Sequence, residues 1–221
     1  MARANQGVSN VAIPDPNTYR ALCFWVIYLG TLDSTFKGEV KQKPKVLFGF
    51  ELNDTSHVFN EEKRPQPFMV SQEMTLNTHD QSAMKKFLED WRGVPLTKAE
   101  IEDTEAEPLI KKFLGKGAMI TVVHNKSDDG KKTFANIGKI GRIPQELRNT
   151  QGQVIQHKVE KPKPINEQLF FDIDEPDWTV FNKLPQWIQK KIEKSPEYQA
   201  AKNGAPASSA QPAAAGTNDD F

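Results

Sequence analysis

One change of hydrophobic period constrains the fold of this chain more than any other feature. Five segments show strand-like patterns: residues 19–32, 46–52, 68–76, 118–124 and 133–143. Between the third and fourth segments, four apolar side chains follow the spacing i, i+3, i+4, i+7: Met84, Phe87, Leu88 and Trp91. This spacing places them on one face of a helix. Asp80 or Ser82 can cap the start of this helix, and Gly93 with Pro95 predicts its end. The sequence therefore predicts three strands, one helix and two strands, in that order.

The first two strand patterns indicate how such strands are buried. Residues 19–32, YRALCFWVIYLGTL, are apolar on both faces and contain Gly30, which predicts a bend. Residues 46–52 alternate, with one apolar face. A helix between the third and fourth of five short strands is the order of the OB-fold, a small Greek-key barrel. We therefore expect a mainly β protein with helices, built on a five-stranded OB-fold barrel; a generic α+β sheet is the alternative.

Composition shifts predict five regions along the chain. They are a flexible N-terminal arm (1–17), the OB-fold barrel (18–145), a linker (146–168), a helical appendage (169–200) and a disordered tail with an acidic-aromatic tip (201–221). Pro185 marks the start of one appendage helix. We expect the appendage to pack either on the barrel or on a second copy of the chain, which would make the protein a homo-oligomer.

Charge, cysteine and hydropathy patterns exclude several classes of protein. The 29 basic and 29 acidic residues balance, which excludes a polycation that binds nucleic acid by bulk charge. Cys23 is the only cysteine and the four histidines are far apart, so we expect no disulfide within the chain, no metal site and no cofactor. No apolar run approaches the roughly 20 residues of a membrane span, and the first ten residues lack a secretory h-region. We expect a cytoplasmic protein, in the host cytoplasm if it is phage-encoded.

Motifs that carry catalysis are missing from the sequence. It contains no glycine-rich phosphate loop, no GxSxG elbow and no HExxH pattern. A metal-dependent nuclease needs carboxylates that converge from strands, and the predicted strands offer Glu51 and Glu73 and little else. We therefore predict that the protein is not an enzyme, with a nuclease as the disfavoured third interpretation.

Two predicted loops are locally basic in an otherwise neutral chain. The loop after the first strand, residues 33–45, has four lysines and two acids; residues 126–142 have five basic residues and two acids. OB-folds grip nucleic acid with these two connections, where lysines neutralise phosphates and aromatic rings stack on bases. The candidate single-stranded-DNA-binding residues are Phe36, Lys37, Lys41, Lys43, Lys63, Arg64, Lys126, Lys131, Lys132 and Phe134. A solvated surface charge is the alternative for each lysine, and a core position is the alternative for Phe134.

The last residues of the sequence predict a second site. A low-complexity stretch at 203–216 precedes Asp219, Asp220 and a C-terminal Phe221. An aromatic ring beside a free carboxylate and two acids suits a pocket with a hydrophobic floor and a basic rim. We therefore predict that Asp219, Asp220 and Phe221 bind partner proteins; a tail without function is the alternative.

These segments carry a resemblance to a known family. The tip resembles the acidic-aromatic tip of bacterial and phage single-stranded-DNA-binding proteins, although it has only two acids and no proline before the phenylalanine. The body resembles a phage replication-associated, OB-type DNA-binding family through YRALCFWVIYLGTL, KVLFGFEL, SAMKKFLEDWRG, GKGAMITVVHNKSDDGKKTFANIGKI and FDIDEPDWTVFNKLPQWIQKKIEKSPEY. The resemblance implies coating and protection of single-stranded DNA during replication or recombination, with partners recruited through the tip. A protein-interaction adaptor of a phage replication complex, with only incidental DNA contact, is the alternative.

Overall fold

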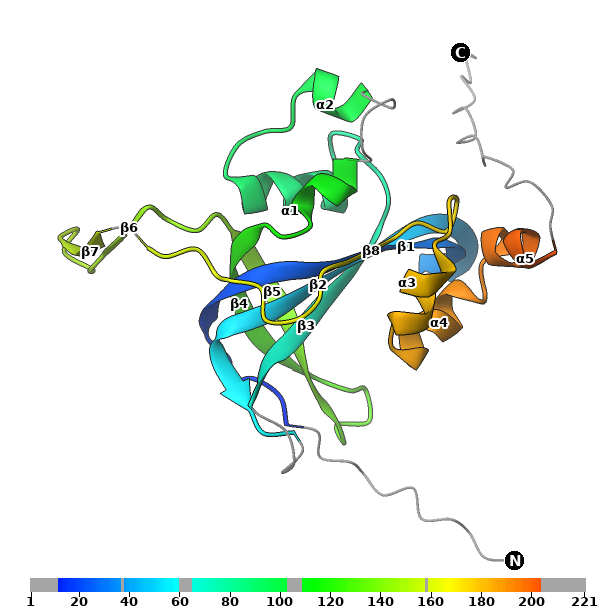
Figure 1. The fold of residues 1–221 in the computed structure, drawn as a ribbon. Coiled ribbons are helices and arrows are strands. Elements are labelled where there is room, and N and C mark those ends of the chain that lie inside the picture. Colours follow the sequence, from blue (N-terminus) through cyan, green and yellow to red (C-terminus); the bar gives the residue numbers. More distant parts are fainter. Residues whose placement is uncertain (1–11, 37, 60–64, 103–108, 158, 204–221) are drawn as a thin grey trace, which may run out of the picture. The chain divides into compact units, whose positions relative to one another are not determined.

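The computed structural model of the chain describes residues 12–36, 38–59, 65–102, 109–157 and 159–203. Its main element is one antiparallel sheet of six strands: β1 (Thr18–Phe36), β2 (Glu39–His57), β3 (Gln66–Thr75), β4 (Gly117–Lys126), β5 (Thr133–Gly141) and β8 (Leu169–Phe171). Five strands follow the order β3-β2-β1-β4-β5, and β8 pairs with β1 (Figure 1). The predicted mainly β fold, with a helix between the third and fourth strands, is confirmed.

The sheet is open, whereas the sequence predicts a closed barrel. Its edges are β3 and β5, and no ladder of hydrogen bonds joins these two strands in the described part of the chain. Residues of the two edge strands nevertheless approach within 8 Å of each other, Cα to Cα. The sixth strand, β8, has only three residues, which is too short for a recognisable alternating pattern.

Helix α1 (Ala83–Arg92) has both of its predicted end signals. The Ser82 hydroxyl accepts a hydrogen bond from the Lys85 N–H at 3.1 Å and caps the first turn. At the other end Gly93 has a φ of +71°, a conformation that costs a glycine little, and its N–H donates to the Glu89 carbonyl at 2.8 Å. A short helix α2 (Lys98–Glu102) and a 3₁₀ helix η1 (Leu109–Phe113) follow before β4.

The main core lies between α1 and the sheet. Phe48 and Phe50 are fully buried on β2, and their rings lie 5.0–6.4 Å, centroid to centroid, from those of Phe87 and Trp91 on α1. The Trp91 indole N–H donates to the Gly117 carbonyl at 2.8 Å, so its one polar group is satisfied. The predicted helix stripe is thus the core face of α1.

The first two strands are longer than their apolar patterns. β1 continues to Phe36 and β2 already begins at Glu39, where the sequence predicts a polar loop. Gly38, with a φ of +83°, lies between the two strands. Pairing between neighbouring strands extends both elements through polar residues, which intrinsic strand propensity does not predict.

The chain divides into two compact units. The sheet unit contains residues 12–27 and 46–170, and the helical unit contains residues 28–45 and 171–203. The helical unit carries the predicted helices, as α3 (Trp178–Lys183), α4 (Gln186–Ile192) and α5 (Pro196–Lys202). None of the helices in the described ranges has the length and apolar character that a membrane crossing requires.

The helical unit is held together by aromatic rings and by one buried carboxylate. Four rings pack at 5.6–5.7 Å between centroids: Phe171, Trp178, Phe181 and Tyr198. Glu197 accepts hydrogen bonds from the Thr31 N–H at 3.0 Å and the Thr31 hydroxyl at 2.5 Å. The preceding Gly30 has a φ of +81°, and a Cβ at this position would lie 2.6 Å from the Ser195 Cβ. The glycine predicted to bend the strand is therefore also required for close packing.

The segment predicted as a linker is structured in part. β6 (Glu146–Arg148) pairs with β7 (Val154–His157) as a separate antiparallel hairpin. Further along, the backbone N–H groups of Ile165 and Asn166 donate to the carboxylate of Glu51 at 2.7 and 3.0 Å, and the Asn166 amide donates to it at 2.8 Å. Glu51 is fully buried on β2, so this strand carboxylate anchors residues 165 and 166 to the sheet.

Candidate nucleic-acid interface

The hairpin of β4 and β5 holds four of the predicted site residues together. Lys126 ends β4 opposite Thr133, and Asn125 pairs with Phe134 at the start of β5. Lys126, Lys131 and Lys132 are all exposed. The hairpin therefore presents three ammonium groups and one aromatic ring within a short stretch of chain.

Hydrogen bonds between Ser127, Asp129 and the backbone shape the turn of this hairpin. The Ser127 hydroxyl donates to the Asp129 carboxylate at 2.6 Å and accepts from the Lys132 N–H at 3.0 Å, while the Lys131 N–H donates to Asp129 at 3.1 Å. These bonds to the ionised form lower the pKa of Asp129. The fixed turn orients the backbone of both lysines while their side chains extend into solvent.

Phe134 is half-exposed, with 48% of its surface accessible, so it is not a core residue. The core alternative that the sequence leaves open is therefore wrong. A ring of this size beside three lysines provides a flat apolar face near positive charge, and this combination allows stacking on a nucleic-acid base.

A second aromatic cluster lies at the hairpin end of β2 and β3. The ring centroid of Phe68 lies 5.6 Å from that of His57, in a stacked arrangement, and 5.4 Å from that of Phe59. Phe59 is 49% exposed, and its neighbours Val58 and Met69 are exposed as well. The sequence pattern leaves residues 53–67 between two predicted strands and did not predict this cluster. The signal was present in the apolar pair Val58-Phe59 directly after a histidine.

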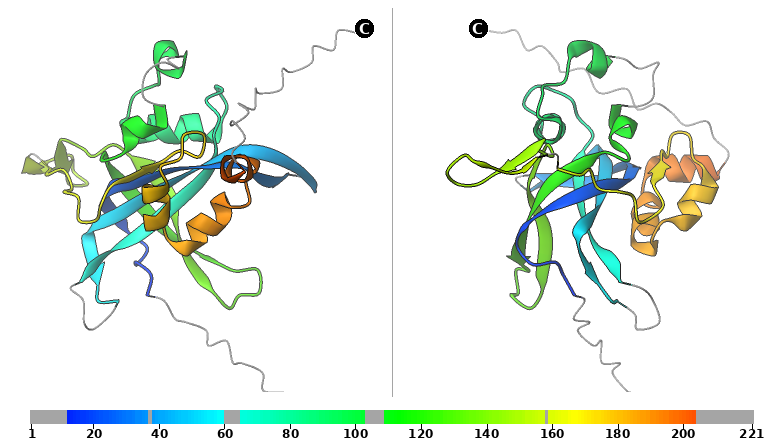
Figure 2. Two further views of the ribbon diagram at one scale, coloured as in Figure 1. Left: turned by 45° about the vertical axis from the view of Figure 1, so that its right-hand side comes forward. Right: turned by 60° about the vertical axis from the view of Figure 1, so that its left-hand side comes forward.

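The two hairpins point toward the same end of the sheet unit. In all three ribbon views the β2–β3 end and the β4–β5 end extend away from α1 (Figures 1 and 2). The edge strands β3 and β5 also approach each other within 8 Å, Cα to Cα. The exposed ring of Phe59 on one hairpin, and the exposed ring of Phe134 with its three neighbouring lysines on the other, therefore lie at the same end of this unit.

Two predicted lysines lie on a different element. Lys41 and Lys43 are in β2 within the helical unit rather than in a loop. The ammonium group of Lys41 pairs with Glu39 at 3.0 Å, and both side chains are well exposed. Lys43 is half-buried.

The other predicted site residues are outside the described structure. This applies to Lys37, Lys63, Arg64, Asp219, Asp220 and Phe221, and to the side chain of Phe36.

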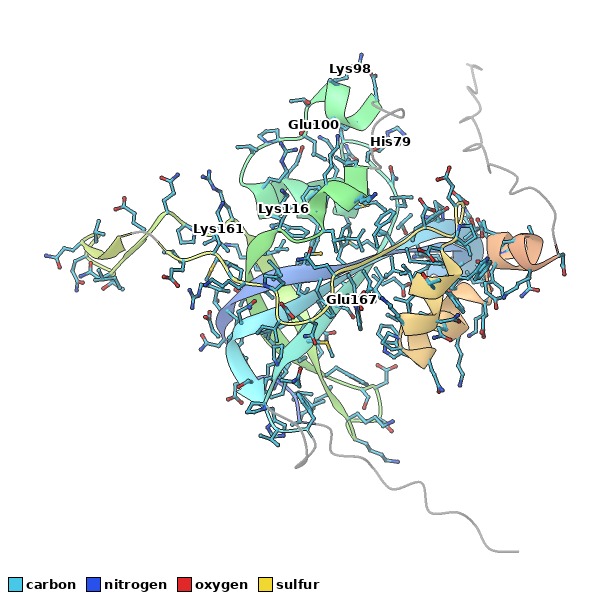
Figure 3. All side chains as sticks on the ribbon, in the orientation of Figure 1. His79, Lys98, Glu100, Lys116, Lys161 and Glu167 are labelled. Atoms are coloured by element: carbon cyan, nitrogen blue, oxygen red, sulfur yellow. The ribbon has the colours of Figure 1, made fainter. Side chains whose placement is uncertain are left out.

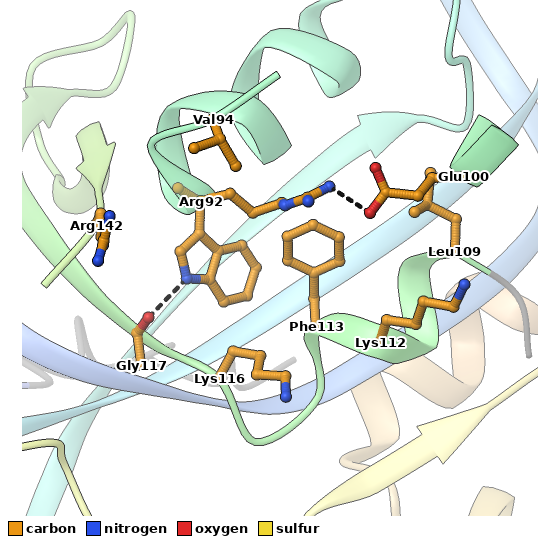
Figure 4. A pocket seen from close by; sticks show the side chains of 10 residues that line it. Arg92, Val94, Glu100, Leu109, Lys112, Phe113, Lys116, Gly117 and Arg142 are labelled. Carbon is orange, nitrogen blue, oxygen red and sulfur yellow. Dashed lines mark hydrogen bonds and ion pairs between the residues drawn. The ribbon is translucent and has the colours of Figure 1, made fainter. Parts of the chain in front are cut away.

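A pocket of about 380 Å³ lies on the α1 side of the sheet unit, which we call the α1 pocket (Figure 4). Four apolar side chains contribute to its lining: Trp91, Val94, Leu109 and Phe113. Trp91 and Phe113 are almost fully buried, with ring centroids 4.8 Å apart, whereas Val94 is 46% exposed. Sequence reasoning did not predict this pocket, because η1 and the end of β5 reach it from distant parts of the chain.

Basic side chains form the rim of the α1 pocket: Arg92, Lys112, Lys116 and Arg142. Among the described residues of the lining Glu100 is the only acid, and it pairs with Arg92 at 2.9 Å. Figure 3 shows Glu100 and Lys116 on the same side of the sheet as α1. Lys116 and Arg142 are exposed, and among the described residues neither has an ion-pair partner.

Metal-binding side chains do not gather in the described part of the chain. No three His, Cys, Asp or Glu side chains in the described ranges lie close enough to hold a metal ion. Cys23 is fully buried, and burial raises the pKa of its thiol. Glu51, which the nuclease interpretation would need, already accepts three hydrogen bonds.

Comparison with known proteins returned no relative. Neither a scan against protein-family models nor a search among curated proteins gave a significant match.

Proposed function

We propose that this chain binds and protects single-stranded DNA. The observation that carries the proposal is the common end of the β2–β3 and β4–β5 hairpins, where exposed Phe59 and Phe134 accompany Lys126, Lys131 and Lys132. Lysines neutralise phosphates, and half-exposed rings stack on bases of any sequence. A duplex keeps its bases stacked inside, so this combination favours single strands.

The OB-type fold belongs to the same proposal. The helix between β3 and β4 has the position expected for that fold, and the two edge strands approach each other without pairing. A sheet whose two edge strands approach each other without pairing is compatible with a partly open Greek-key barrel. The resemblance to phage replication proteins supports a role in replication or recombination, in which Asp219, Asp220 and Phe221 recruit partner proteins.

A titration of labelled oligo-dT and of a matched duplex, each at two salt concentrations, tests the proposal. We expect tight, salt-sensitive binding that prefers the single strand and leaves its length unchanged. Absence of binding at low salt would favour the adaptor alternative. Magnesium-dependent shortening of the oligonucleotide would favour a nuclease and contradict the proposal.

A further inference from the structure

Helix α4 of the helical unit exposes a face that is both aromatic and basic (Figure 1). All four tryptophans lie in the described ranges, and Trp187 is the only exposed one, with 46% of its surface accessible. Three lysines follow it at i+3, i+4 and i+7, so they share its side of the helix: Lys190, Lys191 and Lys194. Lys194 lies just beyond α4, but its N–H donates to the Lys191 carbonyl at 3.2 Å and continues the same turn. We call these four residues the α4 face.

The opposite side of α4 fixes the α4 face in position, because Ile188 and Ile192 are fully buried. The Lys191 ammonium lies over the Trp187 ring, 5.8 Å from its centroid. Lys190 and Lys194 are exposed, and neither has an ion-pair partner among the described residues. A packed helix therefore holds an exposed indole beside two ammonium groups that face solvent.

Acidic side chains of the helical unit lie elsewhere. Helix α4 itself contains no acid. Burial raises the pKa of Tyr198, and Glu193, the acid that follows α4, raises it further. Burial also raises the pKa of Tyr28, and three nearby carboxylates add to this rise: Asp174, Glu197 and Asp172. Residues 204–216, which follow α5 outside the described ranges, contain no acid. Among the described residues, positive charge therefore predominates on the α4 face.

An exposed ring beside lysines suits a single-stranded nucleic acid. Lysines neutralise phosphates, and an exposed indole can stack on an unpaired base. A second copy of the chain would bring an identical positive face against this one in a two-fold contact, and like charges would oppose that contact. A helix of seven residues with one exposed ring has little apolar area to insert into a membrane surface. The chemistry therefore favours a nucleic-acid strand over both of these partners.

We propose that the α4 face is a second contact for single-stranded DNA, in which Trp187 stacks on a base and Lys190 and Lys194 bind neighbouring phosphates. This contact belongs to the helical unit, whereas the β4–β5 hairpin belongs to the sheet unit. The inference rests on the proposed binding of single-stranded DNA and adds a contact outside both basic loops that the sequence indicates. A strand that engages both units gains affinity from each contact.

Anisotropy titrations of the full chain with labelled oligo-dT test the inference. Trp187→Ala should weaken binding by about tenfold, because one stacked base is lost. Combined Lys190→Ala and Lys194→Ala should reduce the slope of log affinity against log salt by about 0.7 for each phosphate that these lysines neutralise. All three residues are exposed, so thermal unfolding of both variants should stay close to that of the wild-type chain.

Intrinsic fluorescence distinguishes stacking on Trp187 from a loss of packing. Trp187→Phe keeps a ring at this position, so its affinity for oligo-dT should lie between those of the wild-type chain and Trp187→Ala. A base that stacks on an indole quenches its fluorescence. The Trp187→Phe variant should therefore lose part of the quenching that oligo-dT causes in the wild-type chain, and unchanged quenching would contradict the stacking of a base on Trp187.

Two controls match these variants. Combined Lys86→Ala and Lys98→Ala removes equal charge from α1 and α2, where the two lysines pair with Asp90 and Glu102. Ile155→Ala removes an exposed apolar side chain that has no ring. Neither control should change the affinity for oligo-dT or the salt slope.

The two proposals fail in different ways. If the Trp187 and lysine variants of the α4 face bind oligo-dT as the wild-type chain does, while Lys131→Ala with Lys132→Ala weakens binding, the inference is wrong and the proposed function stands. Absence of binding by the wild-type chain would overturn both. Variants of the α4 face that alter sedimentation of the chain, or its binding to anionic vesicles, but leave the affinity for oligo-dT unchanged would assign this face to a second copy or to a membrane and would also overturn the inference.

Discussion

The β4–β5 hairpin and the α1 pocket both combine aromatic rings with basic side chains, but the ring is exposed at the hairpin and the rings are buried at the pocket. At the hairpin, Phe134 is half-exposed beside lysines on a hydrogen-bonded turn. At the pocket, Trp91 and Phe113 are buried, whereas Val94, Lys116 and Arg142 are exposed. The first arrangement offers a flat ring to a planar partner, and the second offers apolar space to a side chain that inserts.

The difference shows that composition alone does not distinguish an exposed ring from an enclosed one. Local charge is positive in both regions, and both contain aromatic residues. The exposure of the ring decides between stacking and insertion, and exposure depends on which elements pack around it. The following variants test this difference.

The largest effect is expected for Trp91→Ala. This substitution removes a buried indole and leaves a cavity between α1 and the sheet, so it should lower the free energy of unfolding by about 3–5 kcal/mol. Phe134→Ala is the matched aromatic control and should change stability by less than about 1 kcal/mol. Urea denaturation of both variants measures the difference; equal losses of stability would contradict the contrast between the two rings.

Phe134→Ala should instead affect binding. Loss of one stacked base should weaken binding of oligo-dT by about 1–3 kcal/mol, and Phe59→Ala should act in the same way if both hairpins contact the strand. Anisotropy titrations measure the change. Val58→Ala, next to Phe59 and equally accessible, is the control without a ring. An effect of Val58→Ala as large as that of Phe59→Ala would exclude stacking as the cause.

Substitution of two neighbouring lysines should change the salt dependence of binding to single-stranded DNA. Combined Lys131→Ala and Lys132→Ala should reduce the slope of log affinity against log salt by about 0.7 for each phosphate that these lysines neutralise. The matching pair on β2, Lys41→Ala with Lys43→Ala, tests whether the helical unit contributes to the same interface. An unchanged slope for the first pair would remove the β4–β5 hairpin from the binding site.

The smallest expected effect is on the pH dependence of stability, through Glu100 in the lining of the α1 pocket. Hydrogen bonds from the Thr97 N–H and from Arg92, both at 2.9 Å, hold the pKa of Glu100 at about 2, below its usual 4.5. A depressed pKa of this kind stabilises the fold above pH 4.5, and the contribution is lost as the pH falls toward 2. The difference in melting temperature between wild type and Glu100→Gln should therefore be larger at pH 7 than at pH 3. Glu102→Gln, which removes a neighbouring carboxylate with the longer 3.6 Å pairing to Lys98, is the control for loss of one charge from α2.

Local patterns in the sequence were sufficient for α1 and for the central parts of β1 to β5. The spacing of Met84, Phe87, Leu88 and Trp91 predicts α1 and its buried face, and Ser82 and Gly93 predict its ends. These features depend on neighbours within a few residues, which is the range over which a sequence pattern carries information. The extended ends of β1 and β2 were missed because pairing between strands, not side-chain periodicity, maintains them.

The candidate sites show the same difference between features that depend on near neighbours in the sequence and features that depend on tertiary packing. Lys126, Lys131, Lys132 and Phe134 lie within one hairpin, so the sequence alone placed them together, and local charge indicated their chemistry. The α1 pocket, in contrast, joins residues that are distant in the chain. The His57, Phe59 and Phe68 cluster lies within one hairpin but was not predicted, because strand pairing brings its rings together. Likewise, the burial of Glu51 follows from the return of residues 165 and 166 to β2. Hydrophobic and charge periods report only on the face of one element, whereas tertiary packing decides which faces meet, which rings stay exposed and which carboxylates are enclosed.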